Sequence, residues 1–219
     1  MDYKRILSQF KNKRVLVIGD IILDHYIWGS VDRISPEAPV PVVTVTRENY
    51  LLGGAGNVAS NVVSLGAKAT IAGLVGEDHR GSMVREMLED RGISAEGLVT
   101  APRTTTVKTR VIAQSQQVVR VDREDSSEAD KLFLEKFSAF VRERIASFDA
   151  VIVSDYRKGV ISGDLIRAIN RHAKPRGILV AVDPKVGNFR FYRGVSLITP
   201  NKKEGRREPV FRLLTRPPL

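Results

Sequence analysis

Residues 14–20 read Arg14-Val15-Leu16-Val17-Ile18-Gly19-Asp20. The aliphatic run predicts a short buried strand that ends at Gly19-Asp20, with Asp24 four residues further on. In open α/β sheets, ligands bind just beyond the carboxyl ends of the parallel strands. We therefore expect Asp20 and Asp24 to lie at a ligand site.

Strands and helices alternate along most of the chain. Short aliphatic runs predict further strands, and amphipathic stretches between them predict helices. The expected strands are 68–75, 150–154, 178–183 and 195–199, and the expected helices are 57–65, 81–91, 127–147 and 162–172. This alternation predicts an α/β fold with a doubly wound, mostly parallel sheet and helices on both faces.

Two segments, 28–48 and 104–122, interrupt this alternation. In the first, several prolines exclude a helix, and the valines between them favour extended structure. In the second, two β-rich runs flank the polar Ala113-Gln114-Ser115-Gln116 and predict a hairpin. We expect both segments to join in a small separate β sheet that covers the ligand site as a lid.

A glycine-rich loop precedes the expected helix 57–65. Gly54-Ala55-Gly56-Asn57-Val58-Ala59 matches the loose pattern G-x-G-x-x-A, and glycines that open a helix can present N–H groups to an anion. A dinucleotide-binding loop, however, directly follows the first strand, and this one does not. Two interpretations stay open. The glycines serve only a tight turn, or they act with Asp20, Asp24 and Asn57 to hydrogen-bond the vicinal hydroxyls of a sugar.

Further charged residues belong to the same edge of the expected sheet or to the lid. Asp155 and Asp183 each follow a strand, as Asp20 does, and this set of acids exceeds what helix capping requires. The basic residues near these strand ends or on the lid are Lys158, Lys185, Arg110 and Arg120. Together they suit a phosphate group, although each taken singly is typical of a solvated surface charge.

Composition restricts the class of protein. The 219-residue chain has no cysteine and three histidines, which excludes a disulfide framework and a cysteine nucleophile and is typical of a reducing cytoplasm. No apolar run approaches the roughly 20 residues that span a bilayer, so we expect a cytoplasmic protein without membrane contact. The formal charge of +10 favours anionic partners. Because the basic residues are scattered among acids, we expect small phosphorylated ligands and no nucleic acid.

Several stretches, in order along residues 10–204, resemble the ribokinase-like, or pfkB, carbohydrate kinases. They are Gly19-Asp20-Ile21-Ile22-Leu23-Asp24, 33–42, Gly53-Gly54-Ala55-Gly56-Asn57-Val58-Ala59, 116–122, 154–159, Asp183-Pro184-Lys185 and 197–204. The run Ile34 to Val42 resembles in particular the bacterial heptose-7-phosphate kinases of lipopolysaccharide core synthesis.

The resemblance implies a fold, an activity and partners. The fold is an α/β domain with a β lid that often serves in dimerisation, so a homodimer through the lid is expected. The activity is transfer of the γ-phosphate of ATP, with Mg²⁺, to a sugar hydroxyl. The implied substrate is D-glycero-D-manno-heptose 7-phosphate, phosphorylated at C1 on the route to ADP-heptose.

The resemblance also implies roles for individual residues. The implied sugar-hydroxyl contacts are Asp24, Gly53, Gly54 and Asn57, with Asp20 nearby and Asp155 as the second sugar-contacting acid. Asn201 and Glu204 match the N-x-x-E motif, which helps to organise magnesium and the ATP phosphates. Lys158 and Lys185 are the implied phosphate contacts.

The sequence departs from the family at one decisive motif. The family's catalytic Gly-Ala-Gly-Asp, whose aspartate is the base for the attacking hydroxyl, has no counterpart here. Residues 1–204 resemble the N-terminal two-thirds of a family member, and 205–219 read as an aberrant basic tail of arginines and prolines. We therefore expect a kinase by descent that lacks its C-terminal third and is inactive as this chain. The alternatives are a kinase for another sugar phosphate and a non-catalytic sugar-phosphate-binding or dimerising fragment.

Overall fold

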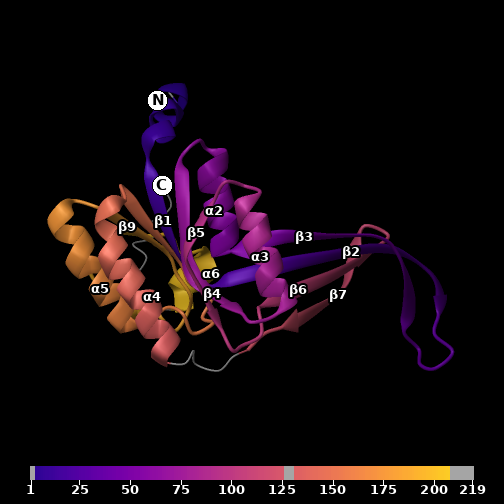
Figure 1. Ribbon diagram of the computed structural model, residues 1–219. Coiled ribbons are helices and arrows are strands. Elements are labelled where there is room, and N and C mark those ends of the chain that lie inside the picture. Colours follow the sequence, from indigo (N-terminus) through magenta and orange to yellow (C-terminus); the bar gives the residue numbers. More distant parts are fainter. Residues whose placement is uncertain (1–2, 126–130, 208–219) are drawn as a thin grey trace, which may run out of the picture.

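The computed structural model describes residues 3–125 and 131–207. Two sheets organise them: a six-stranded sheet that carries the large helices, and a four-stranded sheet that extends away from it (Figure 1). The first strand of the chain belongs to the large sheet, and the second strand belongs to the small sheet. Asp20 is the single residue between these two strands. The predicted ligand site therefore lies at the junction of the two sheets.

The large sheet is parallel throughout. It consists of β1 (Arg14–Gly19), β4 (Lys68–Gly76), β5 (Ser94–Ala101), β8 (Ala150–Ser154), β9 (Leu179–Asp183) and β10 (Leu197–Ile198), in the order β10-β9-β8-β1-β4-β5. β1 lies inside the sheet because its aliphatic residues are buried on both faces. Leu16 and Ile18 belong to one hydrophobic cluster, and Val15 and Val17 belong to the other.

Helices cover both faces, which confirms the predicted doubly wound sheet. α2 (Ala55–Ser64) and α3 (His79–Glu89) pack on the face of Val15 and Val17, and α4 (Lys131–Arg144) and α5 (Gly163–Ala173) pack on the face of Leu16 and Ile18. The shorter segments are α1 (Tyr3–Ser8), α6 (Lys202–Arg207) and the 3-10 turns η1 (Gln9–Asn12), η2 (Ile145–Ser147), η3 (Lys174–Arg176) and η4 (Phe189–Phe191). Within the described part of the chain, no helix is both long and apolar enough to cross a membrane.

The small sheet contains both segments that interrupt the α/β alternation. Its strands are β2 (Ile21–Ile34), β3 (Pro41–Gly54), β6 (Val107–Ala113) and β7 (Gln116–Arg123), in the order β3-β2-β6-β7. The first pair of strands is longer than the expected 28–48, because the buried Ile21, Ile22 and Leu23 continue the chain from β1 without a break. β6 pairs with β2 only from Leu23 to Gly29, so the outer parts of β2 and β3 project as a two-stranded arm (Figure 1).

Other boundaries also differ from the sequence prediction. β5 was not predicted, because Glu96 and Gly97 interrupt its apolar residues and it is an edge strand. α2 begins at Ala55, before the expected position, because Gly54, with a φ of 56°, turns the chain directly from β3 into the helix. α6 begins directly after Asn201 and includes Gly205, Arg206 and Arg207, which were expected to belong to the aberrant tail. The expected helix start at Ser127 and Asp130 and the tail from Glu208 onward lie outside the described residues.

Candidate active site

Tyr156 marks the centre of the candidate site. It is half-buried in the loop that follows β8. Burial raises the pKa of its hydroxyl, and the nearby carboxylates of Asp183, Asp24, Glu204 and Asp20 raise it further. Asp183 and Glu204 line the same pocket as Tyr156, and the charges of Asp24 and Asp20 also act on its hydroxyl. Tyr156 itself was not predicted as a site residue.

Two lysines lie near this ring. The Nζ of Lys108, on β6, lies 5.5 Å from the ring centroid, and the Nζ of Lys185, after β9, lies 5.9 Å from it. Burial lowers the pKa of Lys108; the charge of Asp122 opposes this, and those of Lys158 and Arg120 add to it. Lys185 was predicted, whereas Lys108 was missed. The sequence did contain a signal for Lys108. It lies two residues before Arg110 in a predicted strand, and residues two apart in a strand share one face of the sheet.

The face of the small sheet that carries Lys108 is charged across its width. The strand registers align Asp24 with Lys108 and Asp122, and in the next row Tyr26 with Arg110 and Arg120. Arg120 pairs with Asp122 on its own strand, at 2.9 Å and 3.0 Å. Of the two predicted arginines, Arg110 therefore pairs with the predicted residue Asp24, and Arg120 pairs with an acid of its own strand.

Asp24 and Arg110 form the tightest ion pair of this face. Oδ1 of Asp24 accepts a hydrogen bond of 2.6 Å from a guanidinium nitrogen of Arg110. This bond raises the pKa of Arg110, and the guanidinium also lies 5.2 Å from the ring of Tyr26. Both side chains are partly exposed, at 20% and 22%. Arg110 thus fixes the Asp24 carboxylate while Oδ2 makes no hydrogen bond within the described residues.

The glycine loop shapes the space beside Asp24. A Cβ built on Gly53 would lie 2.5 Å from Oδ2 of Asp24, so glycine is what permits this carboxylate position. The N–H of Ala55, which follows Gly54, donates to the backbone carbonyl of Asp20 at 3.0 Å. Asn57 is exposed in the first turn of α2, and its side chain forms no hydrogen bond to the other described residues.

Asp20 is buried rather than open to a ligand. Its side chain is 1% exposed, and Oδ2 accepts the N–H groups of Tyr156 at 2.7 Å and Lys158 at 3.2 Å. Among the residues that the structure describes, Oδ1 has no hydrogen-bond partner that meets ordinary geometry. Burial raises the pKa of Asp20 to about 6, against the opposing effect of the Tyr156 N–H and with a contribution from the charge of Asp155. Asp20 thus holds the Tyr156 loop through these two hydrogen bonds, and its place near the sugar stays a prediction.

Asp155 is buried in the same way and holds a different segment. It is 2% exposed; Oδ1 accepts the N–H of Arg157 at 2.7 Å, and Oδ2 accepts Asn188 Nδ2 at 2.8 Å and the Tyr192 hydroxyl at 2.5 Å. Burial and the hydrogen bond to Asp155 raise the pKa of Tyr192. Asp155 thus ties the loop after β8 to the loop after β9, instead of pointing a free carboxylate outward.

Lys158 and the N-x-x-E motif have partners of their own. The Nζ of Lys158 is paired with Glu124 beyond the end of β7. Asn201 and Glu204 form a reciprocal capping box, because Oδ1 of Asn201 accepts the Glu204 N–H at 3.0 Å and Oε2 of Glu204 accepts the Asn201 N–H at 2.9 Å. These bonds fix both side chains at the start of α6.

A pocket of about 280 Å³ joins these strand-end groups. Its lining comprises Asp155, Tyr156, Asp183, Pro184, Lys185, Thr199, Asn201 and Glu204. Burial raises the pKa of Asp183, and so does the charge of Glu204, while Lys185 acts in the opposite direction. The pocket therefore brings together the predicted residues Asp183, Lys185, Asn201 and Glu204.

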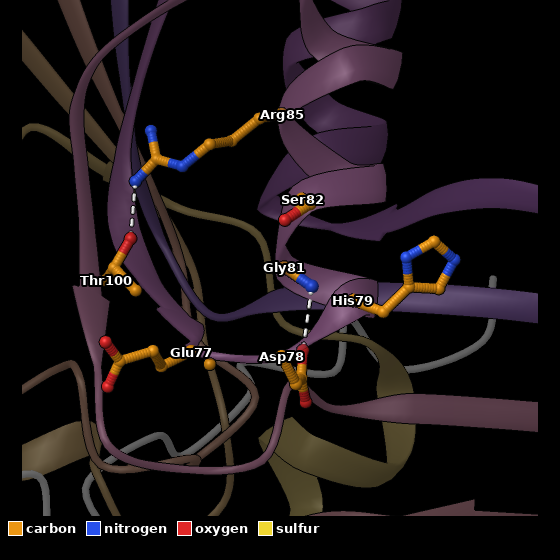
Figure 2. Close-up of a pocket in the computed structure, with 8 residues that line it drawn as sticks. Glu77, Asp78, His79, Gly81, Ser82, Arg85 and Thr100 are labelled. Carbon is orange, nitrogen blue, oxygen red and sulfur yellow. Dashed lines mark hydrogen bonds between the residues drawn. The ribbon is translucent and has the colours of Figure 1, made fainter.

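A second pocket, of about 300 Å³, lies at the start of α3 (Figure 2). Its aspartate is fully engaged: Asp78 accepts the N–H of Gly81 at 2.8 Å and both the N–H and the hydroxyl of Thr105, at 2.9 Å and 2.7 Å. Although burial opposes the change, the hydrogen bonds from Thr105 and Gly81 lower the pKa of Asp78. Arg85 is likewise held by Thr100 at 2.8 Å. We interpret these contacts as structural, because they link the start of α3 to the segment that leads into β6.

The fold and the site define the class of protein. A parallel sheet whose strand-end acids meet a charged β sheet is the arrangement expected of a ribokinase-like carbohydrate kinase. The family model described as "pfkB family carbohydrate kinase" matches residues 12–208, so the chain belongs to this family.

Curated relatives narrow the comparison. "Bifunctional protein HldE" of Caulobacter vibrioides is 51% identical over 196 residues, which cover 89% of this chain and 40% of that protein. The protein of the same name from Syntrophotalea carbinolica is 46% identical over 202 residues, which cover 92% and 41%. The chain thus spans about two-fifths of the length of these relatives.

Solved structures confirm the fold. A putative ribokinase from Agrobacterium tumefaciens has a TM-score of 0.68 at 23% identity, over 90% of this chain and 61% of that one. The Arabidopsis thaliana ribokinase complexed with ribose and ATP has a TM-score of 0.62 at 17% identity, over 90% and 62%. The predicted ribokinase-like architecture is therefore confirmed.

Proposed function

We propose that the site around Tyr156 binds a sugar phosphate, and that it belongs to a kinase acting at C1 of D-glycero-D-manno-heptose 7-phosphate. One observation carries the proposal: Lys108 and Lys185, which suit phosphate, both lie near the Tyr156 ring, at 5.5 Å and 5.9 Å from its centroid. Each has a carboxylate suited to hydroxyls beside it, because Asp24 is paired in register with Lys108 and Asp183 lines the pocket of Lys185. The HldE relatives and the Ile34 to Val42 run support the heptose branch.

Asp24 is the proposed acceptor for a sugar hydroxyl. Arg110 orients the carboxylate through Oδ1, which leaves Oδ2 able to accept a hydrogen bond from a ligand. Gly53 keeps the space beside Oδ2 open. A carboxylate held in this way is set in place before the sugar arrives, which reduces the entropy lost on binding.

The pocket between Asp183 and Glu204 fits the phosphates of ATP with Mg²⁺. The described residues contain no group of three or more side chains that could hold a metal ion by itself. Mg²⁺, however, takes one or two carboxylates and completes its shell with water and phosphate oxygens. Asp183 and Glu204 supply such oxygens, and Lys185 supplies a cation for phosphate. When bound, ATP would supply the transferred phosphoryl group.

The proposal includes a cytoplasmic location. It also includes a homodimer that forms through the small sheet. β7 is the edge strand of that sheet and is exposed along its length. Its valines 118, 119 and 121 are 43%, 46% and 55% exposed. An exposed apolar edge strand is suited to pairing with another chain, and a second copy satisfies it symmetrically.

The test compares ligands and nucleotide turnover on the purified chain. Calorimetry should show heptose 7-phosphate binding at least tenfold more tightly than glucose 6-phosphate, with affinity lost in Arg110→Gln and kept in the exposed control Arg171→Gln. No ADP should form, because the sequence has no Gly-Ala-Gly-Asp aspartate. Light scattering should give a mass of twice 24.3 kDa.

Tighter binding of glucose 6-phosphate would favour a kinase for another sugar phosphate. Absence of binding by either sugar would contradict the proposal, and ADP formation would contradict the inactivity.

Gly53→Ala should separate binding from folding. The new methyl group meets the carboxylate end of Asp24 rather than backbone, so the side chain shifts and the fold is retained. We expect sugar-phosphate affinity to fall about tenfold, equivalent to about 1.4 kcal/mol, while the urea midpoint changes little. Unchanged affinity would show that Asp24 does not contact the sugar.

A further inference from the structure

A basic cavity lies at the opposite end of the large sheet from Asp20. Its volume is about 370 Å³, and it is formed where β1 and β4 begin and where α4 ends. Arg14, Lys68 and Arg144 line it, and Glu96 is the only carboxylate among its lining residues. Phe148 contributes an apolar surface. The proposed kinase function uses none of these residues.

Glu96 neutralises one of the three cations that line this cavity, Arg144. Its Oε2 lies 2.8 Å from a guanidinium nitrogen of Arg144, and its Oε1 accepts the hydroxyl of Ser94 at 3.1 Å. Arg14 and Lys68 face each other in register at the first residues of β1 and β4. Paired residues project to the same face of a sheet, so the two cations are neighbours. Within the described residues, neither side chain forms a hydrogen bond or an ion pair.

Asp149, an acid beside Arg14, already has hydrogen-bond and ion-pair partners. Oδ2 of Asp149 accepts the backbone N–H of Arg14 at 2.8 Å, and Oδ1 lies 3.4 Å from Nζ of Lys13. Lys13 and Asp149 therefore offset each other, as Arg144 and Glu96 do. The charge of Asp149 also acts on Arg14, but two carboxylates, Asp149 and Glu96, face four cations here: Lys13, Arg14, Lys68 and Arg144. Among the described groups at this end of the sheet, the positive charge is therefore in excess, and the side chains of Arg14 and Lys68 stay free of direct ion pairs.

We propose that this cavity binds the phosphate group of a small phosphate ester, at a site separate from the one around Tyr156. Adjacent like charges repel, and a doubly charged phosphate placed between them turns that repulsion into two charge-assisted hydrogen bonds. Thr70, on the same face as Lys68, adds a hydroxyl donor at the cavity wall. The volume matches the lower range of small-molecule sites. A bound ester would join β1, β4 and α4.

The direct test follows backbone amide resonances of Ala69, Gly92 and Ser94, which line the cavity. Titration of the full chain with inorganic phosphate, ADP or glucose 6-phosphate should shift these amides in a saturable way. Equal affinities for the three probes would show that the cavity recognises the phosphate group alone. Tighter binding of ADP would indicate a nucleotide as the ligand, and tighter binding of glucose 6-phosphate would indicate a sugar phosphate. The double variant Arg14→Gln/Lys68→Gln should bind at least tenfold more weakly.

Matched controls make the outcome decisive. Lys11→Gln/Arg171→Gln removes the same charge from exposed positions elsewhere and should leave the cavity titration unchanged. Lys185→Gln alters the Tyr156 site and should also leave the cavity titration unchanged. A failure of the proposed kinase function can therefore be distinguished from a failure of the cavity proposal. The proposal is overturned if no probe shifts the cavity amides of the wild-type chain. It is equally overturned if Arg14→Gln/Lys68→Gln titrates like the wild type.

Discussion

Asp155→Ala is expected to lower the free energy of unfolding by about 4 kcal/mol, because it leaves buried polar groups without partners. The Tyr192 hydroxyl and the Asn188 amide both donate to Oδ2 of Asp155, and these residues are 5% and 7% exposed. Each unsatisfied buried group costs roughly 1–3 kcal/mol. Urea denaturation monitored by circular dichroism measures the change.

Two variants show whether the network is responsible. Tyr192→Phe removes one donor to Asp155, which stays bonded to Asn188 and Arg157, and it also removes the acceptor of the Lys185 N–H. It should therefore cost about 2 kcal/mol, less than Asp155→Ala. Asp164→Ala, on the exposed first turn of α5, should cost less than about 1 kcal/mol. A cost for Asp155→Ala no greater than that for Asp164→Ala would show that water replaces the lost bonds.

This network also shows what the sequence could not reveal. The position of Asp155 after a buried aliphatic strand was predictable, because continuous aliphatic residues indicate an interior strand. The direction of its carboxylate was not, since its partners Asn188 and Tyr192 lie beyond the next strand. Strand-end acids therefore divide into Asp24 and Asp183, which are accessible, and Asp20 and Asp155, which hold loops.

The missed features share a physical cause. Lys108 acquires its role from the register that places it beside Asp24 and over Tyr156, and register is a property of the paired strands. β5 is an edge strand that buries only part of its surface, so its sequence needs no continuous apolar run. Core strands and helices are thus predictable from pattern, whereas pairing partners and edges depend on tertiary context.

The second large effect concerns Asp20 and pH. Burial raises its pKa to about 6 in the folded protein, from 3.8 without burial. Between these values the folded chain holds a proton that the unfolded chain has released, so this group's contribution to stability falls as pH rises. The loss is complete above the folded-state pKa and amounts to about 3 kcal/mol. It originates in the burial of the ionised carboxylate, which the backbone N–H groups that face it offset only in part.

Asp20→Asn removes this titration while keeping an oxygen that can accept the N–H groups of Tyr156 and Lys158. We expect the variant to gain stability relative to the wild type as pH rises from 4 to 7, by an amount on the order of 3 kcal/mol. Urea unfolding of both proteins across this range measures the difference, in which all other titrating groups cancel. A difference that stays constant with pH would show that Asp20 is ionised and solvated in the folded protein. A difference that changes in the opposite direction would mean that the N–H groups of Tyr156 and Lys158 stabilise its charge more than burial opposes it.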